Sequence, residues 1–506
     1  MTSECLQKAR NFEEEHMKRI HPDERPCYHM TGGVGWINDP NGFSLYKGEY
    51  HLFYQYHPYS NEWGPMHWGH VKSRDLIAWE RLPVVMAPDE DYDKDGCFSG
   101  SALELADGKH LIMYTAVQQV AKDDGTTEQF QTQCMALGDG VNYTKYSGNP
   151  VISKDQLPKG GLIADFRDPK IWQEEDGTFY SVIVDMLEDG NGAALLYKST
   201  DAFHWEYCAM LDSSDGKLGN MWECPDFFEL GQKQLLLVSP MAMKPDGNEF
   251  HVGHGTAAII GAYDKKTYTF TREYVHAIDS GIDFYAPQTT VTPDGRRVMI
   301  GWMQAWTNSK FVPEGVKYFG QLSVPRELTM RGGRLIQNPV RELENYRGEL
   351  AAYTDVPVSK EVSLKGVSGR VLDMTVHIHM DESPAAADTS EGKQSFNSFM
   401  IKLACGGEYY TSLCYTPGTS TLRMDRSHSG YLYDIVHSRD IKVTPRDGEL
   451  KLRILLDRYS MEVFINDGEQ AASLTLYTPQ SADGITFCAE GAARISVEKY
   501  ELRFPF

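Results

Sequence analysis

Short apolar runs separated by turn residues dominate the chain from about residue 31 to 338. Examples are the runs at residues 51–56, 111–114 and 298–302. Between such runs lie nine Asp-Gly pairs, which begin at residues 95, 107, 124, 139, 176, 189, 215, 246 and 294. An Asp-Gly pair between hydrophobic runs favours a tight hairpin turn. The pattern therefore predicts an antiparallel meander without crossover helices.

A meander of this length can form a sandwich, a barrel or a propeller. At roughly 45 to 60 residues per four-stranded blade, three hundred residues make about five or six blades. A propeller brings the innermost strand of each blade to one central channel, which would explain why polar motifs recur along the whole region. We therefore predict an all-β propeller at residues 31–338.

The first thirty residues have a helical pattern instead. Their apolar residues at helical spacing are Leu6, Ala9, Phe12 and Met17. Ser3 precedes them and is a favourable N-cap. Residues 1–30 are therefore predicted to form a helical arm that packs on the outside of the propeller.

A second all-β region follows the propeller. Residues 339–350 begin with proline and carry apolar residues on successive turns, which predicts a linker helix. Alternation of apolar and polar residues returns at 451–457 and 460–465, before a turn at 466–468. Residues 351–506 are therefore predicted to form a β-sandwich. The segment 383–395 is rich in Ala, Ser, Asp and Glu and is predicted to be a loop.

Composition narrows the possible partners and the compartment. The 71 acidic and 49 basic residues give a net charge of −22, which disfavours nucleic acid and anionic membrane surfaces as partners. Nine cysteines, with no Cys-x-x-Cys spacing, suit a reducing cytosol and offer no zinc site. The first thirty residues lack an apolar signal segment, and no run of about 18 apolar residues occurs. We therefore expect a soluble cytoplasmic protein of at least two domains.

The sequence Trp-Ile-Asn-Asp-Pro-Asn-Gly at 36–42 is the first candidate for chemistry. Asp39 to Gly42 has the residues of a type I turn, with Asp first, Pro second and Gly last. Such a turn would hold the Asp39 carboxylate rigidly. The turn lies among aromatic and apolar residues, Trp36 before it and 52–54 after it. A fixed carboxylate among aromatic side chains suggests sugar chemistry.

Two further acidic motifs lie in other predicted blades, Phe-Arg-Asp-Pro at 166–169 and Met-Trp-Glu-Cys-Pro-Asp at 221–226. Taken separately, Arg167 and Asp168 could be a surface ion pair in a turn, and Glu223 a solvated strand end. Their occurrence together with Asp39 in three blades favours a shared site in the central channel.

No metal and no cofactor are expected. The sequence Asp91-x-Asp93-x-Asp95-Gly96 begins like a calcium loop, but its twelfth position is Ala102 rather than Glu, so an acidic turn is predicted. The histidines show no metal-ligand spacing. We expect that those at 29, 51, 67 and 70 are hydrogen-bonded neighbours of the central funnel.

Together these motifs resemble glycoside hydrolase family 32, the invertase-like enzymes. The motifs at 36–42, 98–101, 166–169 and 222–225 occur in the family's order, and the segments 63–70, 283–288 and 320–326 also match. The resemblance runs from about residue 28 to the end of the chain. It implies a five-bladed β-propeller followed by a C-terminal β-sandwich, and β-fructofuranosidase activity.

The resemblance also assigns roles to residues. It implies that Asp39 is the nucleophile, that Glu223 is the acid and later the base, and that Asp168 stabilises the oxocarbenium-like transition state. Retaining glycosidases use two carboxyl groups about 5 to 5.5 Å apart. The residues that it places in the substrate pocket are Asn38, Gln55, Trp63, Phe98, Ser99, Arg167 and Tyr285.

Several alternatives stay open at this point. The same scaffold could transfer fructose to another sugar, or bind a fructoside without cleaving it. The substrate could be sucrose, sucrose 6-phosphate or a short fructo-oligosaccharide. A phosphorylated substrate would need a cation at the rim, which the sequence does not identify. The expected partner is a small-molecule sugar, and the protein could be a monomer or a homodimer.

Overall fold

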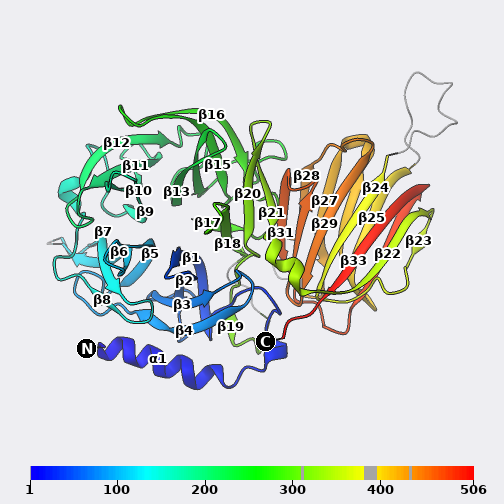
Figure 1. Cartoon of the computed structure of the whole chain (residues 1–506), viewed down its shortest axis with the longest axis horizontal. Helices are drawn as coiled ribbons and strands as arrows, with labels where there is room; N and C mark the ends of the chain where they lie inside the picture. The colour runs from blue at the N-terminus through cyan, green and yellow to red at the C-terminus, as the bar shows by residue number, and fades with distance from the viewer. Residues whose placement is uncertain (1, 123, 309–312, 381–395, 432–435, 506) are drawn as a thin grey trace.

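The computed structural model describes residues 2–122, 124–308, 313–380, 396–431 and 436–505. Figure 1 shows a propeller and a sandwich side by side, with helix α1 (Glu4–Met17) along the outside of the propeller. This arrangement confirms the predicted fold class and the predicted leading helix. The loop expected at 383–395 lies outside the described residues. Within the described residues, no helix combines the length and the apolar character needed to span a bilayer.

The propeller has five blades, each built from four antiparallel strands, and blade 1 carries an additional short strand, β19 (Tyr318–Phe319), which pairs in parallel. Blade 1 contains β1 (Gly35–Tyr46), β2 (Glu49–His57), β3 (His67–Ser73), β4 (Trp79–Met86) and β19. Blade 2 contains β5 (Gly96–Glu104), β6 (His110–Ala121), β7 (Thr127–Gly138) and β8 (Tyr143–Lys145).

The remaining blades follow in chain order. Blade 3 contains β9 (Arg167–Gln173), β10 (Phe179–Met186), β11 (Gly192–Ser199) and β12 (Glu206–Ser213). Blade 4 contains β13 (Trp222–Leu230), β14 (Lys233–Pro240), β15 (Ala257–Asp264) and β16 (Thr269–Ala277). Blade 5 contains β17 (Tyr285–Val291), β18 (Arg297–Trp302), β20 (Arg326–Arg331) and β21 (Arg334–Pro339).

Local turn chemistry and one long-range pairing build this ring. The Asp-Gly pairs at 107, 124, 139, 176, 189 and 294 lie between paired antiparallel strands, as the meander prediction requires. The ring closes where β19, from the far end of the propeller sequence, pairs in parallel with the start of β1. Closure thus fixes the strand that carries Asp39.

A short connection leads to the sandwich. It holds a 3₁₀ helix, η3 (Arg341–Tyr346), and β22 begins directly after it at Arg347. The helix predicted at 339–350 is therefore shorter than expected, because Arg347 already pairs with Leu502 in a sheet.

Two six-stranded sheets form the sandwich around one apolar core. The first contains β22 (Arg347–Val358), β33 (Ala493–Leu502), β24 (Leu372–His379), β29 (Glu449–Asp457), β30 (Ser460–Ile465) and β31 (Gln470–Thr475). The second contains β23 (Glu361–Val362), β32 (Gly484–Gly491), β25 (Phe396–Gly406), β26 (Tyr409–Thr416), β27 (Thr421–His428) and β28 (Ser438–Lys442).

Buried ion pairs join the sandwich to the propeller. Arg326 is fully buried and donates to Glu462 at 2.6 Å and to Asp279 at 3.0 Å. His29 lies between Asp457 and Glu462, at 2.9 Å from each. His29 therefore belongs to the domain interface rather than to the funnel. The histidines at 51, 67 and 70 are hydrogen-bonded, as predicted, and they do not line the central cavity described below.

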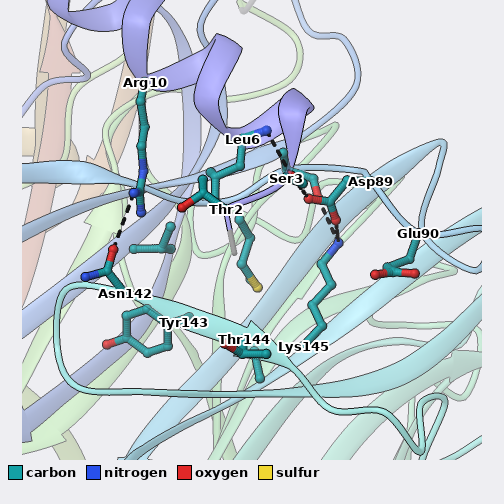
Figure 2. Close-up of a pocket in the computed structure, with 14 residues that line it drawn as sticks. Thr2, Ser3, Leu6, Arg10, Asp89, Glu90, Asn142, Tyr143, Thr144 and Lys145 are labelled. Atoms are coloured by element: carbon teal, nitrogen blue, oxygen red, sulfur yellow. Dashed lines mark hydrogen bonds and ion pairs between the residues drawn. The ribbon is translucent and has the colours of Figure 1, made fainter.

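Helix α1 docks on blades 1 and 2. Ser3 caps it by accepting from the Leu6 N–H at 3.1 Å, and Arg10 donates to the Val84 carbonyl at 2.8 Å. Figure 2 shows the crevice of about 300 Å³ between this helix and the strands below, where Arg10 points to Asn142 and Lys145 to Asp89. Both cations of the crevice are thus engaged with the protein itself.

The acidic segment at 91–95 forms the predicted turn, and Asp93 within it is fully buried. Its carboxylate accepts from the Tyr114 hydroxyl at 2.8 Å and pairs with Lys145. Within the described residues, no group of three or more His, Cys, Asp or Glu side chains could hold a metal ion. All nine cysteines are described and none forms a disulfide.

Candidate active site

The first strands of the blades converge on a cavity of about 390 Å³. Blades 1, 2, 3 and 4 contribute to its wall through β1, β2, β5, β6, β7, β9, β13 and neighbouring loops. Nine of the ten predicted site residues line it: Asn38, Asp39, Gln55, Trp63, Phe98, Ser99, Arg167, Asp168 and Glu223. The cavity therefore brings together three carboxylates that lie far apart in the sequence.

Irregular pairing in the innermost strands aims these side chains. The pairing shifts between Ile37 and Pro40 in β1, between Phe98 and Gly100 in β5, and between Glu223 and Asp226 in β13. A bulge leaves residues unpaired and redirects their side chains. Proline suits such a position because it has no N–H to donate to the ladder.

The prediction of a type I turn at Asp39 to Gly42 is wrong. The segment lies inside β1, where Pro40 and Asn41 pair with Tyr54 and Phe53 of β2. The same local sequence is compatible with a turn or with a bulged strand, and pairing with β2 decides in favour of the strand. The consequence for Asp39 is the same, because its carboxylate is held rigidly in the channel.

Asp39 is buried, and its two oxygens have different surroundings. Oδ2 accepts from the Ser99 hydroxyl at 2.6 Å and from the Cys224 thiol at 3.5 Å. Oδ1 is buried and has no hydrogen-bond partner. Burial, and then the negative charge of Glu223, raises the pKa of Asp39 to about 6, against the opposing effect of its hydrogen bonds. One oxygen is thus fixed and the other is available to react.

Asp168 stands beside Asp39 in a left-handed backbone conformation, with a φ of 63°. Its Oδ2 accepts from the Cys224 N–H at 2.9 Å and lies 3.6 Å from the Cys224 sulfur. Burial raises the pKa of Asp168; the Arg167 charge opposes this and the Glu223 and Asp39 charges add to it. The Cys224 thiol therefore lies between two carboxylates, a contact that the sequence did not indicate.

Glu223 is held at both oxygens. Arg167 donates to Oε1 through Nη2 at 3.1 Å and Nε at 3.3 Å, and the Tyr285 hydroxyl donates to Oε2 at 2.7 Å. Arg167 also contacts Asp165 at 3.2 Å. Burial lowers the pKa of Arg167, but the charges of Glu223, Asp168 and Asp165 outweigh it and raise the pKa, so Arg167 stays a cation. The structure thus places beside Glu223 a cation that its neighbours in sequence do not supply.

The other predicted residues differ in their exposure. Trp63 is 49% exposed at the rim, and its ring meets Phe98 edge-on with centroids 5.9 Å apart. Gln55 is buried and donates to the Cys97 carbonyl at 3.0 Å. Tyr285 is buried and does not line the cavity, although its hydroxyl contacts Glu223. Its assignment as a substrate contact stays a prediction.

Sequence reasoning missed part of the cavity wall. The lining residues outside the family motifs include Asp95, Gln119, Gln129, Gln131, Asp165, Met241 and Trp306. Gln129 and Gln131 alternate with Phe130, which predicts that both glutamines point to the same face of a strand. This alternation is a sequence signal for that part of the wall. Loop residues such as Met241 and Trp306 give no comparable signal.

Similar proteins and a similar solved structure all point to one family. The chain is 34% identical to a sucrose-6-phosphate hydrolase of Zymomonas mobilis subsp. mobilis, over 96% of this chain and 94% of that protein. It is 35% identical to a raffinose invertase of Escherichia coli, over 90% of each chain. A solved Bombyx mori GH32 beta-fructofuranosidase in complex with sucrose matches with a TM-score of 0.83 and 32% identity, over 99% of both chains.

Family models cover nearly the whole sequence. The model of the glycosyl hydrolases family 32 N-terminal domain matches residues 29–339, which span the propeller. The model of the family's C-terminal domain matches residues 342–503, which span the sandwich. The chain belongs to glycosyl hydrolase family 32.

Proposed function

We propose that this protein is an invertase-type β-fructofuranosidase that releases terminal non-reducing β-D-fructofuranosyl residues from sucrose-type substrates through a covalent fructosyl-enzyme. Family membership and the names of the relatives support the hydrolysis of such substrates. The observation that carries the mechanism is the meeting of Asp39 and Glu223 in one cavity, with Asp39 Oδ1 free of partners.

In the first step, Asp39 Oδ1 attacks the anomeric C2 carbon of the fructosyl group. The bond from C2 to the bridging oxygen breaks, and that oxygen takes the proton from the Glu223 carboxyl group. The leaving sugar departs as a neutral alcohol, and the fructosyl group stays on Asp39 as an ester. Splitting one displacement into two lowers each barrier.

In the second step, water replaces the leaving sugar. The Glu223 carboxylate takes a proton from the water while the water oxygen bonds to C2 and the ester bond to Asp39 breaks. Fructose leaves with its configuration retained, and both carboxyl groups return to their starting states. Arg167 and Tyr285 hold Glu223 in position through both proton transfers.

Asp168 would stabilise the positive charge that develops on the sugar ring. It stands next to Asp39 and is fixed by the Cys224 N–H. A carboxylate acting on the transition state lowers kcat far more than it changes KM when it is removed. Asp168→Asn should therefore lose most of kcat while KM for sucrose changes little.

Two substitutions and two substrates test the roles. Asp39→Ala should abolish cleavage of both sucrose and a nitrophenyl β-fructofuranoside, because both need the nucleophile. Glu223→Ala should lose about 10²- to 10⁴-fold in kcat on sucrose but far less on the nitrophenyl substrate, whose leaving group needs no proton.

The matched control is Asp176→Ala, which removes an exposed aspartate from the β9–β10 turn. It should retain wild-type kinetics on both substrates. Equal losses on the two substrates in Glu223→Ala would contradict the assignment of Glu223 as the acid.

A further inference from the structure

One wall of the cavity is a face of the β6–β7 hairpin of blade 2. The strands pair in register, with Thr115 opposite Gln133, Val117 opposite Gln131 and Gln119 opposite Gln129. Residues two apart on a strand point to the same face, so these three pairs form successive rungs on one side of the hairpin. Members of both upper rungs line the cavity.

The lowest rung is tied to the catalytic strands. Thr115 Oγ1 accepts from the Asp168 N–H at 2.9 Å, and Gln133 donates to the Phe166 carbonyl at 2.9 Å. This rung therefore lies at the level of the carboxylates, where the fructosyl group would react. At a rise of about 3.3 Å per residue, the Gln119–Gln129 rung stands about 13 Å further out along the strand. The upper rungs thus flank the path of the leaving group.

Amides supply the hydrogen-bonding groups of these upper rungs. Gln119 donates to the Gln129 side-chain carbonyl at 3.1 Å, and Gln131 Oε1 lies 3.5 Å from Arg167. Within the described part of the chain, this leaves the Gln129 amide nitrogen and the Gln119 side-chain oxygen without a partner. A neutral donor and acceptor pair suits sugar hydroxyls, which both donate and accept.

The charge around this face is unfavourable for an anion. Among the described residues that line the cavity, five are acidic and one, Arg167, is basic. Arg167 is already engaged by Glu223 and Asp165. Asp95 lies beside the top rung, where its carboxylate accepts from the Gln119 N–H at 2.6 Å. A phosphate group on the leaving sugar would meet carboxylates here.

We propose that Gln119, Gln129 and Gln131 form the binding face for the leaving group, and that this face selects an uncharged sugar over a phosphorylated one. The inference rests on the proposed fructofuranosidase function and specifies its substrate class. It separates sucrose and short fructo-oligosaccharides from sucrose 6-phosphate, although several relatives are named for the phosphorylated substrate.

The first test compares kcat/KM for sucrose and sucrose 6-phosphate with the full-length protein. At low salt, kcat/KM should be about tenfold or more higher for sucrose than for sucrose 6-phosphate. This difference in kcat/KM should become smaller as added salt screens the carboxylates. A preference for sucrose 6-phosphate, or equal rates, would overturn the inference. Cleavage of neither substrate, nor of a fructo-oligosaccharide, would instead refute the proposed function.

The second test adds a cation to the face. Gln129→Lys should raise kcat/KM for sucrose 6-phosphate about fivefold or more and lower it for sucrose, because a local positive charge attracts the phosphate. Its matched control is Gln173→Lys, which adds the same charge at the exposed far end of β9, outside the cavity lining.

The control should leave both substrates at wild-type rates. Equal gains in the two variants would show that net charge alone sets the preference, and would refute a local role for the hairpin. An unchanged preference in Gln129→Lys, in a variant that still melts like the wild type and cleaves sucrose, would place the leaving group elsewhere.

Discussion

At the scale of single residues, the unequal surroundings of the two Asp39 oxygens make a pH prediction. In the proposed mechanism Asp39 must be ionised to attack, and its pKa is raised to about 6 by burial and by Glu223. Asp168 must also be ionised, and its pKa is raised to about 7. Activity should therefore fall as the pH falls through about 7 to 6, by tenfold or more per pH unit. The measurement is kcat/KM for sucrose across the acidic range.

Ser99→Ala provides the comparison. The Ser99 hydroxyl donates to the Asp39 carboxylate and opposes the rise in pKa. Without it the pKa should rise further, and the acidic limb should move to higher pH. A limb that stays in place in Ser99→Ala would show that another group controls it.

Tyr285 tests how Glu223 is positioned. Its hydroxyl donates to Glu223 Oε2 at 2.7 Å, and the hydroxyl oxygen lies 3.0 Å from the Ser239 carbonyl oxygen. The residue lies outside the cavity lining. Tyr285→Phe should lower kcat on sucrose about tenfold with little change in KM, because orientation of the acid is lost and no cavity wall changes.

Activity on a nitrophenyl β-fructofuranoside should fall much less in Tyr285→Phe, since that leaving group needs little help from Glu223. A rise in KM with unchanged kcat would show instead that Tyr285 contacts the substrate, as the family resemblance implies.

At the scale of elements, closure of the ring by β19 positions the strand of Asp39. Gly320 follows β19 with a φ of 93°, and a Cβ at this position would lie 2.3 Å from the Ile37 carbonyl oxygen. Gly320→Ala should therefore lower the melting temperature and reduce kcat, because Ile37 must shift and Asp39 lies two residues further on.

Gly295→Ala is the matched control for that substitution. Gly295 has a similar φ of 83° in the β17–β18 turn, but a Cβ there would meet no atom within 4 Å. It should show only the conformational penalty of about 1 kcal/mol, whereas the clash at Gly320 adds roughly 1 to 3 kcal/mol. Equal melting temperatures of the two variants would argue against a tight closure.

At the scale of the whole molecule, the domain interface depends on a buried imidazolium. Burial lowers the pKa of His29, but its hydrogen bonds to Asp457 and Glu462 outweigh this and raise the pKa to about 9, from 6.5 in the unfolded chain. Its contribution to stability is therefore complete below about pH 6.5 and is lost as the pH rises through about 9.

The melting temperature should accordingly decline between these pH values. His29→Gln should melt at a lower temperature at pH 6 and should flatten the decline, because the group that releases the proton is gone. A decline of the same steepness in His29→Gln would assign the alkaline loss of stability to other residues.

The strands, the leading helix and the candidate carboxylates could be predicted from the sequence alone, because they depend on short-range interactions. Alternating apolar runs and Asp-Gly turns gave the strands, and their number without crossover helices limited the fold to closed or layered all-β architectures. Ser3 and the apolar spacing after it located helix α1 within a few residues. The motifs around Asp39, Asp168 and Glu223 identified the candidate carboxylates, because in each motif a proline follows the acidic residue by one or two positions.

The contacts between those residues could not be predicted from the sequence, because they form only when distant segments come together. The Cys224 thiol reaches Asp39 from 185 positions away, and Arg167 reaches Glu223 from 56 positions away. Pairing with β2 turned the expected turn at Asp39 into a bulged strand, and the register of β6 and β7 placed three glutamines on one wall. Such contacts depend on strand pairing between distant segments, so the residues next to each side chain in the sequence do not indicate its partner.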